Sequence, residues 1–234
     1  MIEDTLIVDF HAHILPGADH GSSGIAESTE QLNLLKKYGV DTVVATPHFY
    51  PNILNVKDFI EFRDICAEKI KNKELITRPE VCMGAEVLIC EGMDAMPDIG
   101  LLCIRGTRCI LIEMPFSEWS AEIVKAVLNI KRKGFDVILA HIDRYVKNQE
   151  NELAYIIEEG VKVQINAEAL VSSGMRKRLM PYINEGSVWA LGSDLHGCKE
   201  KDMKTFASGY KLLGDNCKPI MAKAEELLSE AERL

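Results

Sequence analysis

Residues 6–21 read LIVDFHAHILPGADHG and place three of the chain's six histidines directly behind a short apolar run. Comparable runs rich in Val, Ile, Leu and Cys recur through the 234 residues, at 6–8, 42–45, 81–85, 109–112, 137–140, 161–165 and 188–191. Short continuous apolar runs are typical of strands that are buried on both faces, as in a parallel sheet. We therefore expect seven parallel strands.

Helical patterns fill the segments between these runs, at 25–38, 56–71, 123–133, 150–159 and 175–184, and a last amphipathic pattern covers 219–234. Four patterns end at a glycine, a common helix C-cap, at Gly39, Gly134, Gly160 and Gly186. Strand, helix and glycine repeat without a linker, which predicts a single α/β domain over residues 1–234 with helices around a barrel-like sheet. The alternative, an open doubly wound sheet, would carry GxGxxG or GxxxxGK[ST] after the first strand, and neither occurs.

The net charge, the apolar runs and the cysteines of the chain argue against several classes of protein. The formal net charge of -9 disfavours binding along nucleic acid, which usually needs a basic face. No apolar stretch reaches the roughly 18 residues that span a bilayer, and Glu3 and Asp4 stand where a signal peptide would be basic, so a cytoplasmic protein without membrane insertion is expected. The seven cysteines are odd in number and form no CxxC pair, which indicates reduced thiols.

Polar residues follow the apolar runs. In a parallel α/β barrel the carboxyl ends of all strands share one rim, where active sites lie. The residues that stand there are His11, His13, His20, His48, Glu86, Glu113, His141, Arg144, Asn166, Asp194 and His196. A lone histidine is usually a hydrogen-bonded structural residue, but here all six histidines are at strand ends.

The spacing of these residues favours a role in metal binding. His11 with His13 and Asp194 with His196 are two residues apart, so on an extended chain both members of a pair point the same way. Glu86 would be costly inside an apolar run without a cationic partner, either a Lys or Arg side chain or a metal ion. Six His, two Glu and one Asp make nine candidate ligands, enough for three ions with bridging groups, whereas one tetrahedral zinc would leave most of them unused.

Three further residues have two readings each. Arg144 could clamp phosphate through its planar bidentate donors, or be an ordinary solvated loop arginine. Asp9 could orient a ligand or satisfy buried backbone. Asn166 could contact substrate or cap its strand.

The ordered set HAHILPGADHG, MGAEV, LIEM, AHIDRY, QINA and GSDLH, which covers essentially the whole chain, resembles the polymerase and histidinol phosphatase superfamily. Within it, HILPGxD and AHIxRY are most similar to the bacterial manganese-dependent protein tyrosine phosphatases of the CpsB/CapC/YwqE group, which act in capsule and exopolysaccharide synthesis. The resemblance implies a distorted (βα)7 barrel with three divalent ions, expected to be Mn, with Fe, Zn or Co as alternatives. The implied ligand sets are His11, His13, Glu86 and Asp194; Glu86, Glu113 and His141; and His20, His48 and His196.

The chain departs from the group at two places. His20 stands where the group has aspartate, and Lys201 stands near the place of an arginine that follows the SDLH motif, although an ammonium does not reproduce a bidentate fork. We expect Arg144, Asn166 and Lys201 to bind substrate, and His141, Asp194 and Arg144 to act in catalysis. None of the cysteines fits C-x5-R, so a cysteine-dependent phosphatase is disfavoured.

The expected reaction is hydrolysis of a phosphotyrosine protein, for example the C-terminal tail of a bacterial tyrosine kinase. A metal-bridging hydroxide would attack phosphorus. Two alternatives are a phosphatase of a small metabolite such as histidinol phosphate, and a non-catalytic metal-binding regulatory protein.

Overall fold

The computed structural model describes residues 5–71 and 79–234. Its strands are β1 (Val8–Ala12), β2 (Thr42–Ala45), β3 (His48–Phe49), β4 (Glu80–Met83), β5 (Glu86–Leu88), β6 (Cys109–Glu113), β7 (Asp136–Leu139), β8 (Lys162–Asn166) and β9 (Val188–Gly192). Its α-helices are α1 (Ile25–Lys37), α2 (Val56–Lys71), α3 (Ala121–Arg132), α4 (Glu150–Glu158), α5 (Ser173–Asn184), α6 (Glu200–Leu212) and α7 (Cys217–Leu227). No helix within the described ranges is long and apolar enough to cross a membrane.

The strands form a distorted barrel. Hydrogen bonds join the strands into two sheets, one in the order β1-β2-β4 and the other in the order β3-β5-β6-β7-β8-β9. Every pair of neighbouring strands in both sheets is parallel. Since only two residues separate β2 from β3 and β4 from β5, each pair is one strand broken in the middle. The segment after β9 meets β1 through two backbone hydrogen bonds, from Asp194 N to His11 O (2.8 Å) and from His13 N to Leu195 O (3.1 Å). The predicted α/β fold, with parallel strands in a barrel-like arrangement, is confirmed, but after β5 the 3-10 helices η1 (Met93–Ala95) and η2 (Ile99–Leu102) stand in place of an α-helix.

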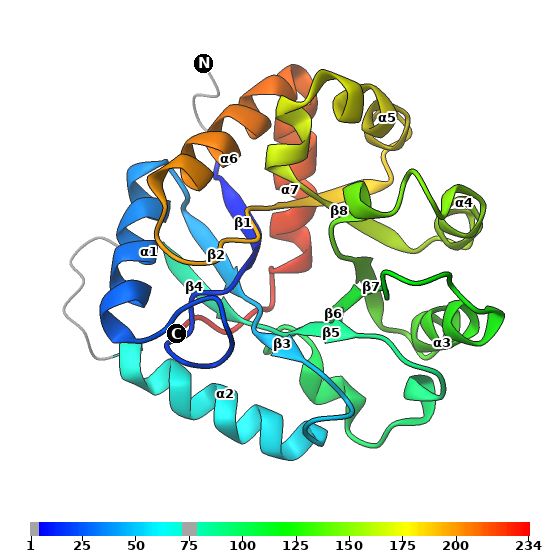
Figure 1. Ribbon diagram of the computed structural model, residues 1–234, viewed down its shortest axis with the longest axis horizontal. Coiled ribbons are helices and arrows are strands. Elements are labelled where there is room, and N and C mark those ends of the chain that lie inside the picture. Colours follow the sequence, from blue (N-terminus) through cyan, green and yellow to red (C-terminus); the bar gives the residue numbers. More distant parts are fainter. Residues whose placement is uncertain (1–4, 72–78) are drawn as a thin grey trace.

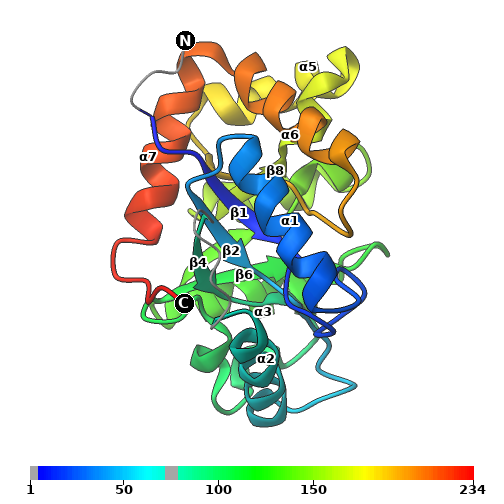
Figure 2. The same cartoon turned by 90° about the vertical axis from the view of Figure 1, so that its left-hand side faces the viewer.

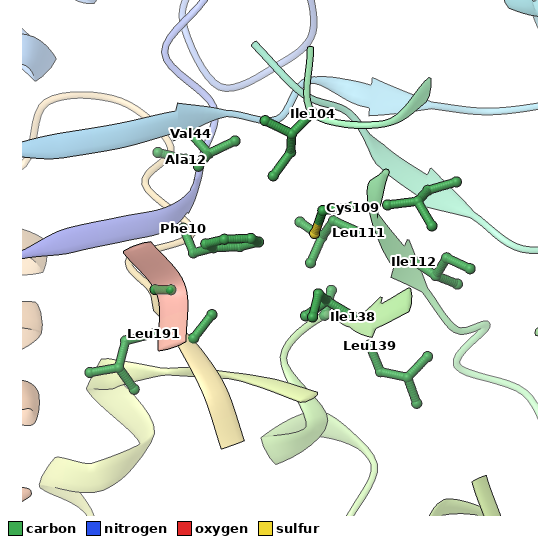
Figure 3. Close-up of a cluster of buried hydrophobic side chains, with 14 of the residues drawn as sticks. Phe10, Ala12, Val44, Ile104, Cys109, Leu111, Ile112, Ile138, Leu139 and Leu191 are labelled. Carbon is green, nitrogen blue, oxygen red and sulfur yellow. The ribbon is translucent and has the colours of Figure 1, made fainter. Parts of the chain in front are cut away.

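Helices surround the strands on the outside (Figure 1), and a view from the side shows α7 and α1 on opposite flanks of β1 and β2 (Figure 2). Both faces of the strands are therefore covered, which explains their continuous apolar runs. Inside the barrel, Phe10 of β1 lies among side chains from the other strands, including Leu111 and Ile138 (Figure 3). Buried hydrophobic residues from all these strands form one cluster.

Most element boundaries agree with the sequence patterns. The predicted glycine C-caps at Gly39, Gly134, Gly160 and Gly186 all have left-handed φ angles, from 80° to 86°. The predicted first strand is displaced, since β1 extends to Ala12 and includes His11. The last helix was expected at 219–234, but α7 ends at Leu227. The prediction of one domain over residues 1–234 stays a prediction.

Helix α6 was not predicted, and it is important for the site because it follows the loop that carries Asp194 and His196. It packs on the short 3-10 helix η4 (Ala167–Val171), which follows Asn166 at the end of β8. The contact is so close that a Cβ atom on Gly209 would lie 1.8 Å from the carbonyl oxygen of Ala167. A glycine is required there, and it lets α6 hold two rim loops together.

Candidate metal centre

The first two histidines of the opening stretch lie side by side at the end of β1. With one residue between them, both side chains point the same way from the extended chain. The Nε2 atoms of His11 and His13 are 3.1 Å apart, and both side chains are fully buried. The i, i+2 spacing thus produces the pair that the sequence predicts.

Glu86, the first residue of β5, lies at the centre of the imidazoles. Its Oε2 atom is 3.2 Å from the Nε2 atoms of His11 and His13 and 2.9 Å from Nδ1 of His48. Its Oε1 atom is 2.7 Å from Nε2 of His141. One buried carboxylate therefore faces imidazoles from β1, β3 and the end of β7.

Asp194 and Glu113 add two more carboxylates to the cluster, Asp194 near the histidine pair and Glu113 near His141. Asp194 Oδ1 is 3.7 Å from Nε2 of His11 and 3.5 Å from Nε2 of His13, and Glu113 Oε1 is 3.8 Å from Nε2 of His141. Among the residues that the structure describes, four overlapping groups have their ligand atoms within 4.8 Å of one another: His13, His48 and His196; His11, His13 and Asp194; His11, Glu86 and His141; and His48, Glu86 and Glu113. The structure thus brings eight of the nine predicted ligands together.

His20 is the ninth and lies at the edge of the cluster. Its exposed ring stacks on His48 at 5.0 Å between centroids with an interplanar angle of 9°, and on His196 at 4.5 Å. In the group with His48 and His196, the third imidazole is His13, where the resemblance implies His20. The role of His20 as a ligand stays a prediction.

Two of the site residues have strained backbones. His141 and Asp194 have φ angles of 33° and 52°, in the left-handed region that side chains rarely adopt, at a cost of about 1–3 kcal/mol each. Hydrogen bonds hold both residues in place, from His141 N to Gln164 Oε1 (2.6 Å) and from Asp194 N to His11 O (2.8 Å). The left-handed conformation turns the chain sharply after β7 and after β9. It thereby directs the side chains of His141 and Asp194 toward Glu86 and the histidine pair.

Outer acceptors orient three of the imidazoles. The Nδ1 atom of His13 is 2.6 Å from Oδ2 of Asp19, that of His11 is 3.3 Å from Oε1 of Gln164, and that of His196 is 2.9 Å from the carbonyl oxygen of Asp194. An acceptor at Nδ1 fixes the proton there and leaves Nε2 free to bind a metal. Asp19 and Gln164 were not predicted. The signal for Asp19 was its place between two histidines, in the turn that leads to His20.

Asp19→Asn is expected to weaken the binding of a divalent ion at the candidate centre about 10- to 100-fold, the usual cost of losing an outer carboxylate behind a metal-binding histidine. The Asp19 carboxylate also accepts hydrogen bonds from the backbone N–H groups of Gly21 and His48, so an amide in its place would turn a donor toward other donors. Competition titration with a chelator measures the change. Asp215→Asn, on an exposed residue, is the control, and an unchanged Kd in Asp19→Asn would contradict the role.

Asp9 satisfies buried backbone, the second of its two predicted roles. Its Oδ1 atom accepts hydrogen bonds from the N–H groups of Ser193 (2.8 Å) and His11 (3.3 Å). Burial raises its pKa to about 6 despite these bonds. Asp9 therefore ties β1 to the loop that carries Asp194.

The three predicted substrate-binding residues differ in position. The guanidinium of Arg144 pairs with Asp194 Oδ2 and lies 3.2 Å from Nε2 of His141. Asn166 is buried and donates to Asp194 Oδ2 at 3.1 Å. Lys201 is exposed in the first turn of α6, and within the described ranges it contacts none of the nine predicted ligands. Arg144 and Asn166 are thus at the site, and substrate binding by all three stays a prediction.

Electrostatics keeps two of the carboxylates ionised. Burial opposes ionisation of Glu86 and Asp194, but the surrounding histidines, His11 foremost, hold both pKa values well below the usual range. Glu113 differs, because burial and the charge of Glu86 raise its pKa to about 7. Burial and the nearby His13 lower the pKa of His196 to about 4. His196 is therefore neutral at pH 7, the form in which imidazole binds metal.

The donor set fits divalent metal ions. Glu86 Oε2, His48 Nδ1 and His196 Nε2 are buried, and none has a well-aligned hydrogen-bond partner among the described residues. Buried polar atoms of this kind usually have a partner. The four groups consist of imidazoles and carboxylates and include no thiolate, a combination that suits Mn, Fe, Zn or Co.

Comparisons with known proteins agree on one family. The model of the family described as capsular polysaccharide synthesis, CpsB/CapC, matches residues 7–214. The tyrosine-protein phosphatase YwqE of Bacillus subtilis is 26% identical, over 95% of this chain and 91% of that protein, and CpsB of Streptococcus agalactiae is 23% identical, over 88% and 89%. A solved structure from a study of YwqE of B. subtilis and CpsB of Streptococcus pneumoniae, called metal-dependent tyrosine phosphatases there, superposes with a TM-score of 0.77 at 22% identity and covers 97% of each chain.

Proposed function

We propose, on the premise that this chain belongs to the CpsB/CapC family of capsular polysaccharide synthesis, that it is a metal-dependent tyrosine phosphatase. The observation that carries the proposal is the buried Glu86 carboxylate among four imidazoles, with the Arg144 guanidinium beside them. Carboxylates and imidazoles hold divalent ions, and a guanidinium binds phosphate through a planar fork. The names of the relatives agree with this chemistry.

The proposed ligands divide among three divalent ions, with Mn as the proposed metal. His11, His13 and Asp194 would share Glu86 with a second set of Glu113 and His141, and His48 and His196 would hold a third ion with His13 or His20. When bound, the ions supply positive charge for the phosphoryl oxygens and lower the pKa of water toward neutrality. Asp19 and Gln164 keep the imidazole rings in position for this role.

The remaining residues position the phosphate. Arg144 is 33% exposed and contacts Asp194 and His141, so its N–H groups would be available to hold two oxygens of a phosphoryl group bound at the cluster. Asn166 holds the Asp194 carboxylate beside it. Hydrolysis of a tyrosine phosphate needs no dedicated general acid to protonate the leaving group. The phenol of tyrosine has a pKa of about 10, so its phenolate leaves more easily than an alkoxide. The proposed substrate is therefore a tyrosine-phosphorylated protein, such as the tail of a bacterial tyrosine kinase. A cytoplasmic location stays a prediction.

Removing the metal should abolish hydrolysis and lower the melting temperature. An ion present at 100 times its Kd stabilises the folded chain by about 2.7 kcal/mol, provided that the unfolded chain does not bind it. Dialysis against a chelator, followed by thermal unfolding with and without added Mn²⁺, measures the shift. Protons compete for the imidazoles, and although burial opposes it, the neighbouring carboxylates raise the pKa values of His11 and His13 above the usual range. The stabilisation at a fixed Mn²⁺ concentration should therefore shrink as the pH falls, beginning above the ordinary imidazole pKa of about 6.5. A melting temperature unaffected by Mn²⁺ at pH 7.5 would contradict the metal site.

The activity itself is tested with three substrates in the presence of Mn²⁺: a phosphotyrosine peptide, histidinol phosphate and a generic aryl phosphate. The phosphotyrosine peptide should have the highest kcat/KM. A higher value for histidinol phosphate would assign the chain to small metabolites instead. Metal binding without hydrolysis of any of the three would indicate a regulatory protein and overturn the proposed activity.

A further inference from the structure

Phe116 is the most exposed large hydrophobic side chain of the described residues, with 73% of its surface accessible. It stands in the loop between β6 and α3, three residues after Glu113. A phenyl ring left in water forgoes the stabilisation that burial would give, about 25 cal/mol per Å² of apolar surface. An aromatic ring that is exposed at the edge of a site is a candidate contact for a ligand.

The loop under Phe116 is held rigidly. Three of its carbonyl oxygens accept hydrogen bonds from buried side chains: Tyr145 Oη donates to Met114 O (2.7 Å), Trp119 Nε1 to Pro115 O (3.0 Å) and Gln149 Nε2 to Ser117 O (3.2 Å). The ring of Trp119 also meets that of Tyr145 edge to face, with 5.2 Å between centroids. Phe116 is therefore exposed on a fixed support, which reduces the entropy lost when a ligand packs against it.

The ring stands beside Arg144. The guanidinium carbon is 5.9 Å from the centroid of the Phe116 ring, and the Tyr145 ring is 6.3 Å from it. Arg144 and Tyr145 are adjacent in the chain, so the loop that carries the proposed phosphate ligand also supports Phe116. A phosphate on Arg144 would place its ester group within reach of the Phe116 ring.

We propose that Phe116 determines specificity by packing against the aromatic ring of an aryl phosphate monoester whose phosphate lies on Arg144. This inference rests on the proposed function and adds the element that selects tyrosine phosphate over alkyl phosphates. Aromatic pairs contribute beyond their buried area. The competing interpretation is that Phe116 only supports the Arg144 side chain. In that case, removing the Phe116 ring would weaken the binding of every phosphate equally, with or without an aromatic ring.

Phe116→Ala and Phe116→Tyr in the Mn²⁺-loaded protein distinguish these readings. Phe116→Ala should lower kcat/KM for a phosphotyrosine peptide about 3- to 10-fold, and Phe116→Tyr, which keeps the ring, should preserve it. Competitive inhibition by inorganic phosphate, which has no ring, should not change. Phe62→Ala, on an exposed phenylalanine of α2, is the control and should leave all values unchanged.

A binding measurement separates this inference from the proposed activity. Calorimetric titration with a non-hydrolysable phosphonate analogue of the same peptide should show the same 3- to 10-fold loss in Phe116→Ala, about the strength of one aromatic pair. If the wild type hydrolyses nothing but binds the analogue through Phe116, the activity is wrong and the ring contact stands. Equal losses for the peptide and for inorganic phosphate, or no loss for the peptide, would overturn the role of Phe116.

Discussion

Glu86→Gln is expected to remove bound metal and to lower kcat at least about 10³-fold, since the ions supply most of the charge that the reaction needs. The substitution keeps the size of the side chain but removes its charge. It also replaces one of two oxygens, each of which faces an imidazole nitrogen, with an N–H donor. Among the three predicted carboxylate ligands, Glu86 is the most buried and faces the most imidazoles, so neither Glu113 nor Asp194 is placed to replace it.

Metal content after purification and kcat with saturating Mn²⁺ are the two measurements. Far-UV circular dichroism shows whether the barrel is retained. Glu122→Gln, on an exposed residue of α3, is the matched control and should change neither value. If Glu86→Gln keeps its full metal content and its turnover, the assignment of Glu86 as the shared ligand is wrong.

Much of the fold could be predicted because strands covered on both faces need continuous apolar runs, and helices between them need one apolar stripe. The breaks between β2 and β3 and between β4 and β5 could not. They arise where the chain bends at 46–47 and 84–85, so that His48 and Glu86 begin new short strands in place of ending long ones.

Helix α6 was missed although its buried residues Met203, Phe206 and Tyr210 have helical spacing. Gly209 weakens the helical pattern, because glycine is a poor helix former. The glycine is required by tertiary packing, since a residue with a Cβ atom at this position could not approach Ala167 so closely. A requirement set by a distant segment of the chain leaves no periodic signal in the local sequence.

The candidate ligands could be found because chemistry at a barrel rim concentrates unusual residues at strand ends. Of the residues that orient them, Gln164 could not be found because it lies inside a strand, and Asp19 was missed despite its place between two histidines because aspartate is also an ordinary turn residue. The Nδ1 contacts of His13 and His11 depend on distances between segments, which spacing alone does not give. Position after a strand likewise did not distinguish His20 from His13 as the partner of His48 and His196.

Arg144→Ala is expected to lower kcat/KM about 10²- to 10³-fold while metal content stays at the wild-type level. The guanidinium contacts Asp194 and His141, and it lies 3.9 Å from Glu113 Oε1. Without it, the phosphate would lose its bidentate partner and the negative charge of Asp194 would face it directly. The proposed metal ligands themselves would be unchanged.

Arg144→Lys makes the prediction specific to the fork. A lysine keeps the positive charge but offers a single ammonium on a flexible stem, so it should recover only part of the loss. The Kd of inorganic phosphate for the Mn²⁺-loaded protein should rise in the order wild type, Arg144→Lys, Arg144→Ala, and metal analysis should give the same content for all three. Equal phosphate affinity in the three proteins would remove Arg144 from phosphate binding. A loss of metal in Arg144→Ala would instead make it a support for Asp194, because the two side chains are paired.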